Sequence, residues 1–218
     1  MKLVTFEKFI LRCLDQDKWQ TLFRLGSAGE VEQTDTLYQL LRNQAEKETI
    51  YMISLEGIDY MSAISTHALI KASMRIFMER KKPVIFIQAS GEVLVGLKQV
   101  SNLLAEDIKL WVIDTKGQEE VLGHIPDRLR EILDLAKQKQ YLSASDIPNL
   151  RGEVSNKKSI NNASVYLQDM FNMGLLLRKK VTGSSRNIES RGWTYTYYLP
   201  YSELNIFHNY KQINMVVI

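Results

Sequence analysis

The stretch Ser159–Met173, SINNASVYLQDMFNM, decides how the second half of this chain folds. Its apolar residues Ala163, Leu167 and Met170 are spaced by four and then three, which is the period of an α-helix with one buried face. Gly174 follows and is suited to ending a helix, because glycine adopts left-handed backbone angles at no steric cost. The sequence therefore predicts a helix with one face in a core and a polar face outside.

A basic β-hairpin is predicted directly after this helix. Leu175–Val181, LLLRKKV, passes into a strand, 182–192 is a polar loop, and Trp193–Leu199, WTYTYYL, returns with strong β propensity. The basic residues on or beside the hairpin are Arg178, Lys179, Lys180, Arg186 and Arg191.

Two further helices are predicted before the quoted stretch. The first begins near Pro126, which suits a first helical turn, and reaches Gln140. Its apolar positions at helical spacing are Leu129, Ile132, Leu133 and Ala136. A short second helix is entered through Ser143 and ends at the Arg151-Gly152 break. The order of elements is thus three helices and a hairpin, an α+β arrangement.

Charge separates this region from the rest of the chain. Met1–Asp127 has a net charge of −3, whereas Arg128–Ile218 has a net charge of +6. A mildly acidic part followed by a basic part indicates that only the second meets a polyanion. We therefore expect two domains, 1–125 with an N-terminal extension and 126–218 with a C-terminal tail.

The first domain alternates strands with amphipathic helices. Strands are predicted at Trp19–Leu25, Thr49–Leu55, Val84–Ile87 and Lys109–Asp114. The apolar stripes of the intervening helices are Leu37, Leu40 and Leu41; Ile64, Ala68, Ala72 and Ile76; and Val93, Leu97, Val100 and Leu104. Nearly continuous apolar strands alternating with helices are typical of an α/β fold with a mainly parallel, helix-covered sheet.

Within this domain, Leu55–Ser65, LEGIDYMSAIS, is followed by a Lys-Pro strand at Lys82–Ile87. These segments resemble the strand, acidic loop and helix start of the STAS domain of anti-sigma factor antagonists, across roughly Trp19–Asp114. The resemblance implies a domain for assembly or signal input. In phospho-regulated members a serine in this loop is phosphorylated, but the matching position here is Ile64.

Hydroxyl groups near that position remain candidates for regulation. Ser62, Ser65 and Thr66 could accept a phosphate, whose charge is tolerated at a helix N-terminus. The simpler interpretation, which we favour, is that these hydroxyls cap the helix.

Three helices followed by a basic hairpin resemble the winged helix-turn-helix domain of transcriptional regulators, and Leu167–Leu176 is similar to the end of that family's recognition helix. The resemblance implies binding of double-stranded DNA, with Asn161, Asn162, Ser164 and Val165 nearest the bases and Arg186 near the wing tip. The other candidate contacts are Lys157, Lys158, Ser159, Tyr166, Gln168, Arg178, Lys179, Lys180 and Arg191. Lys157 and Lys158 precede the helix, where a phosphate would meet two ammonium groups and the helix N-terminus.

The resulting expectation is a cytoplasmic, homodimeric transcription regulator that reads duplex DNA. The dimer contact could be the STAS-like domain, the connecting helix near 127–140, or the apolar tail Met215–Ile218. The alternative is a non-catalytic partner-switching regulator, whose STAS-like domain docks on a regulatory protein and whose basic domain is an accessory contact.

Enzymatic, cofactor, metal and membrane functions are not indicated. His67, His124 and His208 lack the spacing of a metal site, and Glu56 and Asp59 have no nucleophile or base beside them. Cys13 is the single cysteine, which fits a reducing compartment such as the cytoplasm. No apolar run approaches the length of about 20 residues that crosses a membrane.

Overall fold

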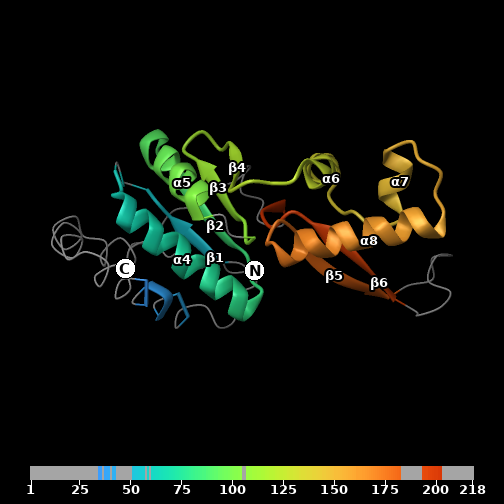
Figure 1. The fold of residues 1–218 in the computed structure, drawn as a ribbon, viewed down its shortest axis with the longest axis horizontal. Coiled ribbons are helices and arrows are strands. Elements are labelled where there is room, and N and C mark those ends of the chain that lie inside the picture. The colour runs from blue at the N-terminus through green and yellow to red at the C-terminus, as the bar shows by residue number, and fades with distance from the viewer. Residues whose placement is uncertain are drawn as a thin grey trace, which may run out of the picture. The chain divides into compact units, whose positions relative to one another are not determined.

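The computed structural model describes residues 34–35, 37–39, 41–42, 51–56, 58, 60–104, 107–182 and 193–202. The chain forms two compact units, the first ending at His124 and the second beginning at Ile125 (Figure 1). The predicted strand Trp19–Leu25 lies outside the described residues, as do Arg186 and Arg191. No helix in the described part of the chain is both long and apolar enough to span a bilayer.

A four-stranded mixed sheet organises the first unit. Its strands are β1 (Tyr51–Ser54), β2 (Val84–Ala89), β3 (Leu110–Asp114) and β4 (Glu119–Leu122), which lie side by side in chain order. The first three are parallel, and β4 runs antiparallel to β3. The predicted α/β class with a mainly parallel sheet is therefore confirmed.

Two helices, α4 (Ala63–Arg80) and α5 (Gly91–Leu104), connect the parallel strands. Because strand order follows chain order, right-handed crossovers place both helices on one face of the sheet, where they pack against each other (Figure 1). The buried residues of α4 include Ala68, Ala72 and Ile76, as the spacing predicts. Burying these stripes against the sheet is the main stabilising contribution to this unit.

Strand β4 was not predicted from the sequence. It is short, begins with Glu119 and Glu120, and has no apolar alternation that would indicate a strand. A turn brings it back beside β3: the Asp114 side chain accepts hydrogen bonds from the backbone of Lys116 and Gln118, each at 2.8 Å. Pairing with an existing strand therefore decides this element, rather than local propensity.

The second unit consists of α6 (Asp127–Gln138), α7 (Asp146–Leu150), α8 (Lys157–Asn172) and a hairpin of β5 (Leu177–Thr182) and β6 (Trp193–Tyr198). The apolar positions predicted for α6, namely Leu129, Ile132, Leu133 and Ala136, are all buried. Helix α7 packs against both α6 and α8. Figure 1 shows α8 lying along the hairpin.

The start of α7 differs from the prediction. The helix begins at Asp146 rather than at Ser143. The reason is that the Asp146 carboxylate accepts hydrogen bonds from both the backbone N–H and the hydroxyl of Ser143, each at 2.7 Å. These bonds hold 143–145 in a turn before the helix.

A bridge joins the segment between α6 and α7 to the hairpin. Leu142 and Tyr197 exchange two backbone hydrogen bonds, of 2.8 and 2.7 Å. Both residues are buried, and the Tyr141 ring makes an edge contact with Tyr198, at 5.7 Å between centroids. The hairpin is thereby attached to the helical part of the unit at a point that the sequence did not indicate.

Candidate nucleic-acid interface

Helix α8 has a buried face and an exposed polar face. Ala163, Leu167 and Met170 are 2%, 0% and 0% exposed, which confirms the apolar face predicted from their spacing. Gly174, with φ of 84°, follows the helix in the left-handed region that glycine tolerates. The side of α8 opposite these three residues is consequently turned away from the core of the unit.

A capping box sets the start of α8 two residues earlier than predicted. The Asn156 side chain accepts hydrogen bonds from the backbone N–H groups of Lys158 and Ser159, both at 3.0 Å. The Ser159 hydroxyl in turn accepts from the Asn156 backbone N–H, also at 3.0 Å. Ser159, a predicted DNA contact, is thus engaged in the cap, and Asn156 is a site residue that sequence reasoning missed.

This cap brings Lys157 and Lys158 into the first turn of α8, where both are exposed. The dipole of a helix N-terminus favours anions, and two ammonium groups beside it strengthen that preference. The predicted base contacts Asn161, Asn162, Ser164 and Val165 are also exposed. A single helix therefore presents positive charge at its start and amide and hydroxyl groups along its next two turns.

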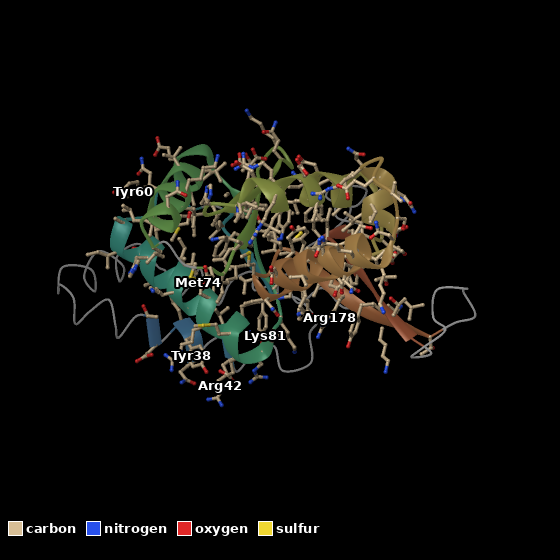
Figure 2. All side chains as sticks on the ribbon, turned by 45° about the vertical axis from the view of Figure 1, so that its right-hand side comes forward. Tyr38, Arg42, Tyr60, Met74, Lys81 and Arg178 are labelled. Carbon is tan, nitrogen blue, oxygen red and sulfur yellow. The ribbon has the colours of Figure 1, made fainter. Side chains whose placement is uncertain are left out.

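Two other predicted DNA contacts, Gln168 and Arg178, instead bond to each other within the unit. The guanidinium of Arg178 donates a hydrogen bond to the Gln168 amide oxygen, and the Gln168 nitrogen donates to Asn172 at 3.0 Å. Arg178, which is labelled in Figure 2, also stacks on the rings of Phe171 and Tyr195, with its guanidinium carbon 4.2 and 4.4 Å from their centroids. Arg178 thus connects β5 to α8.

The same guanidinium lies near Tyr197, the β6 residue paired with Arg178 across the hairpin. Burial raises the pKa of the Tyr197 phenol, and the adjacent Arg178 opposes that shift. At neutral pH the phenol is uncharged, so the positive charge of Arg178 is not cancelled there.

Tyr166 and the remaining hairpin lysines occupy different surroundings. The Tyr166 ring is partly buried and lies 5.6 Å from the Arg128 guanidinium of α6, a basic residue beside α8 that was not predicted. Lys179 and Lys180 are exposed on β5. Successive strand residues alternate in direction, so Lys180 shares its face of the hairpin with Arg178 and Lys179 points to the other.

In the first unit, the hydroxyls considered for regulation gather at the start of α4. Ser62 is the N-cap of this helix, and its oxygen accepts a hydrogen bond from the Ser65 backbone N–H at 3.1 Å. Ser65 and Thr66 are buried, and the Thr66 hydroxyl donates to the Ser62 carbonyl at 2.9 Å. Modifying either buried hydroxyl would require the helix start to open.

A shallow cavity of about 420 Å³ lies beside this helix start. It lies between the beginnings of α4 and α5, and its walls include Tyr60, Met61 and Val95. Tyr60 is 70% and Val95 is 53% exposed, so two large side chains of this wall are open to solvent. With these apolar side chains on its walls, the hollow suits a protein side chain better than an ion.

Among the described residues, no group of three or more His, Cys, Asp or Glu side chains is arranged to hold a metal ion. Comparisons of the chain with protein-family models, with curated proteins and with solved structures gave no match. The geometry of α8, its cap and the hairpin is therefore the basis for a functional proposal.

Proposed function

We propose that this protein is a DNA-binding transcription regulator whose second unit acts as a winged helix. The observation that carries the proposal is the exposed face of α8, which combines Lys157 and Lys158 in its first turn with Asn161, Asn162 and Ser164 beyond them. Ammonium groups at a helix start suit a phosphate, and the amides and hydroxyl that follow suit base edges in a major groove.

The hairpin supports the same proposal. Lys179 and Lys180 are exposed on β5, next to the helix that carries the polar face. Between Arg151 and Arg191 the sequence has eight basic and three acidic residues. The bridge between Leu142 and Tyr197 pairs the segment between the first two helices with the hairpin, which is consistent with a winged-helix arrangement. A duplex would thus meet positive charge from both the helix start and the hairpin.

The first unit serves assembly or signal input in this proposal. Its mixed sheet covered by α4 and α5 is compatible with a STAS-like domain, although Ile64 excludes the family's usual phosphoserine. We propose a cytoplasmic homodimer that reads two half-sites, without enzymatic activity, metal or cofactor.

Selection of bound fragments from random duplex DNA, performed with the full chain at two salt concentrations, tests the proposal. We expect enrichment at moderate salt, and four to six phosphate contacts predict a log–log slope of roughly −4 to −5 per bound unit. Failure to enrich any duplex, together with a stable complex with another protein, would contradict the proposal.

A second function, partner switching through protein contacts, is favoured by the cavity beside Tyr60 and Val95. Apolar side chains exposed around a hollow are typical of protein interaction sites. In that case Tyr60→Ala would abolish complex formation with the regulatory partner, whereas Lys157→Ala would leave the complex intact.

A further inference from the structure

From the chemistry of the exposed face of α8 we infer that this helix selects A·T base pairs, through Asn161 and Val165. The inference rests on the proposed function, because it names the kind of base that the same surface recognises. It requires that the two side chains face the duplex together and that their chemistry matches one base pair. It also requires that residues suited to the other pair are missing from the face beyond the first turn, whose lysines are assigned to phosphates.

Asn161 and Val165 meet the first requirement. They are four residues apart on α8, which places them on the same side of the helix with about 5–6 Å between their Cβ atoms. Both are exposed, Val165 by 57%, and both lie on the side away from the buried Ala163, Leu167 and Met170. Because base pairs are stacked about 3.4 Å apart, this spacing lets the two residues reach the same or neighbouring base pairs.

Their chemistry matches adenine and thymine. An asparagine amide can accept a hydrogen bond from adenine N6 and donate one to adenine N7, while an aliphatic side chain packs against the thymine methyl group. Val165 is an apolar residue on an otherwise polar face, so contact with a methyl group would remove its exposed surface from water.

Beyond the first turn of α8, where Lys157 and Lys158 are assigned to phosphates, the face has no residue of the type that reads guanine. The commonest contact to guanine is a bidentate arginine or lysine on O6 and N7. Between Ser159 and Asn172 the sequence contains neither residue type, and its one charged side chain is the partly buried Asp169. Gln168, an amide that could also read adenine, is engaged by Arg178 and Asn172. Asn162 is also exposed, but it lies about 100° around the helix from Asn161, so Asn161 is the amide that shares a side of α8 with Val165.

The test uses the full chain and the duplex enriched by selection from random DNA. In that duplex, thymines of the core site are replaced by uracil, which lacks the methyl group, and adenines by 7-deazaadenine, which lacks N7. The native chain is expected to lose about fourfold in affinity for the uracil duplex and about tenfold for the 7-deazaadenine duplex.

The variants assign each loss to a residue. Val165→Ala is expected to bind the thymine and uracil duplexes equally, and Asn161→Ala to bind the adenine and 7-deazaadenine duplexes equally. Leu103→Ala is the control, since Leu103 is an exposed aliphatic residue of α5 to which neither proposed function assigns a contact, and it should keep both discriminations.

A G·C core in the enriched sites, or a native chain indifferent to both modified bases, would overturn the inference while leaving DNA binding intact. The inference would also be overturned if Val165→Ala and Asn161→Ala distinguished the modified duplexes from the unmodified one as strongly as the native chain does. Absence of any enriched duplex would instead contradict the proposed function itself.

Discussion

Arg178 in β5 donates a hydrogen bond to Gln168 in α8, so one guanidinium joins the hairpin to the exposed helix. The same group stacks on Phe171 and Tyr195, from α8 and β6 respectively. A flat, delocalised cation satisfies these contacts together, which a lysine ammonium cannot do. We therefore regard Arg178 as a positioning residue, which sets the hairpin relative to the face that would meet DNA.

Replacing Arg178 tests this role. Arg178→Ala should reduce the free energy of unfolding by about 1–2 kcal/mol, because a hydrogen bond and two cation–π contacts are lost. Arg178→Lys should restore little of this loss, since an ammonium does not stack as a guanidinium does. Urea denaturation measures the change, and Lys179→Ala, an exposed neighbour on β5, should be nearly neutral. Equal stability of Arg178→Ala and Lys179→Ala would contradict the assignment.

Removal of Lys157 and Lys158 should weaken DNA binding without altering sequence preference. If each lysine contacts one phosphate, the double variant to alanine should make the log–log salt dependence shallower by about 2. Titration of labelled duplexes at several salt concentrations gives this slope. Lys116→Ala, an exposed lysine of the first unit, is the control and should keep the native slope. A change in the preferred sequence, with the slope unaltered, would argue against phosphate contacts.

The Ser62 hydroxyl should act as a helix cap. Ser62→Ala should destabilise the first unit by about 1 kcal/mol, because the Ser65 backbone N–H loses its acceptor. Ser62→Asp should retain most of the stability, since aspartate also caps helices and its charge favours the N-terminus. Chemical denaturation measures both variants. If Ser62→Ala is fully stable while Ser62→Asp changes the assembly state, Ser62 is instead a regulatory position.

Acid should weaken the contact between Tyr38 and α4. The Tyr38 hydroxyl donates a hydrogen bond to the Glu79 carboxylate, which lowers the Glu79 pKa below its ordinary value of 4.5. Arg42 and Arg80 lower this pKa further. A lowered folded-state pKa means that the stabilisation is fully present above pH 4.5 and is lost as the pH falls through the lower folded value.

Thermal unfolding measured from about pH 6 to about pH 3 tests whether stability depends on the ionisation of Glu79. This range lies on both sides of the ordinary pKa of 4.5. Glu79→Gln should show a smaller loss of stability across the acidic part of the range than the native chain. Asp107→Asn, which removes an exposed carboxylate near the start of β3, should follow the native curve. Identical curves for Glu79→Gln and the native chain would show that this carboxylate does not contribute.

Much of the fold could be predicted because its elements are amphipathic over several turns. The spacing of Ala163, Leu167 and Met170 predicts the buried face of α8, and the apolar run at Val84–Ile87 predicts a buried strand. Strand β4 could not be predicted, because its Glu119-Glu120 start has no strand pattern of its own. The exact beginning of α8 was also missed, because it depends on the reciprocal bonds between Asn156 and Ser159.

By itself, the sequence determined the long amphipathic helices and the apolar strands, and it placed the basic charge in the second half of the chain. These properties depend on the period of apolar residues and on composition, which are local. Only the tertiary structure decided which polar residues are engaged and which are exposed. Gln168 and Arg178 look like free contacts in the sequence, yet they bond to each other, whereas Asn161 and Val165 remain exposed. The physical reason is that a side chain's partners come from elements distant in the chain, here β5 packed against α8.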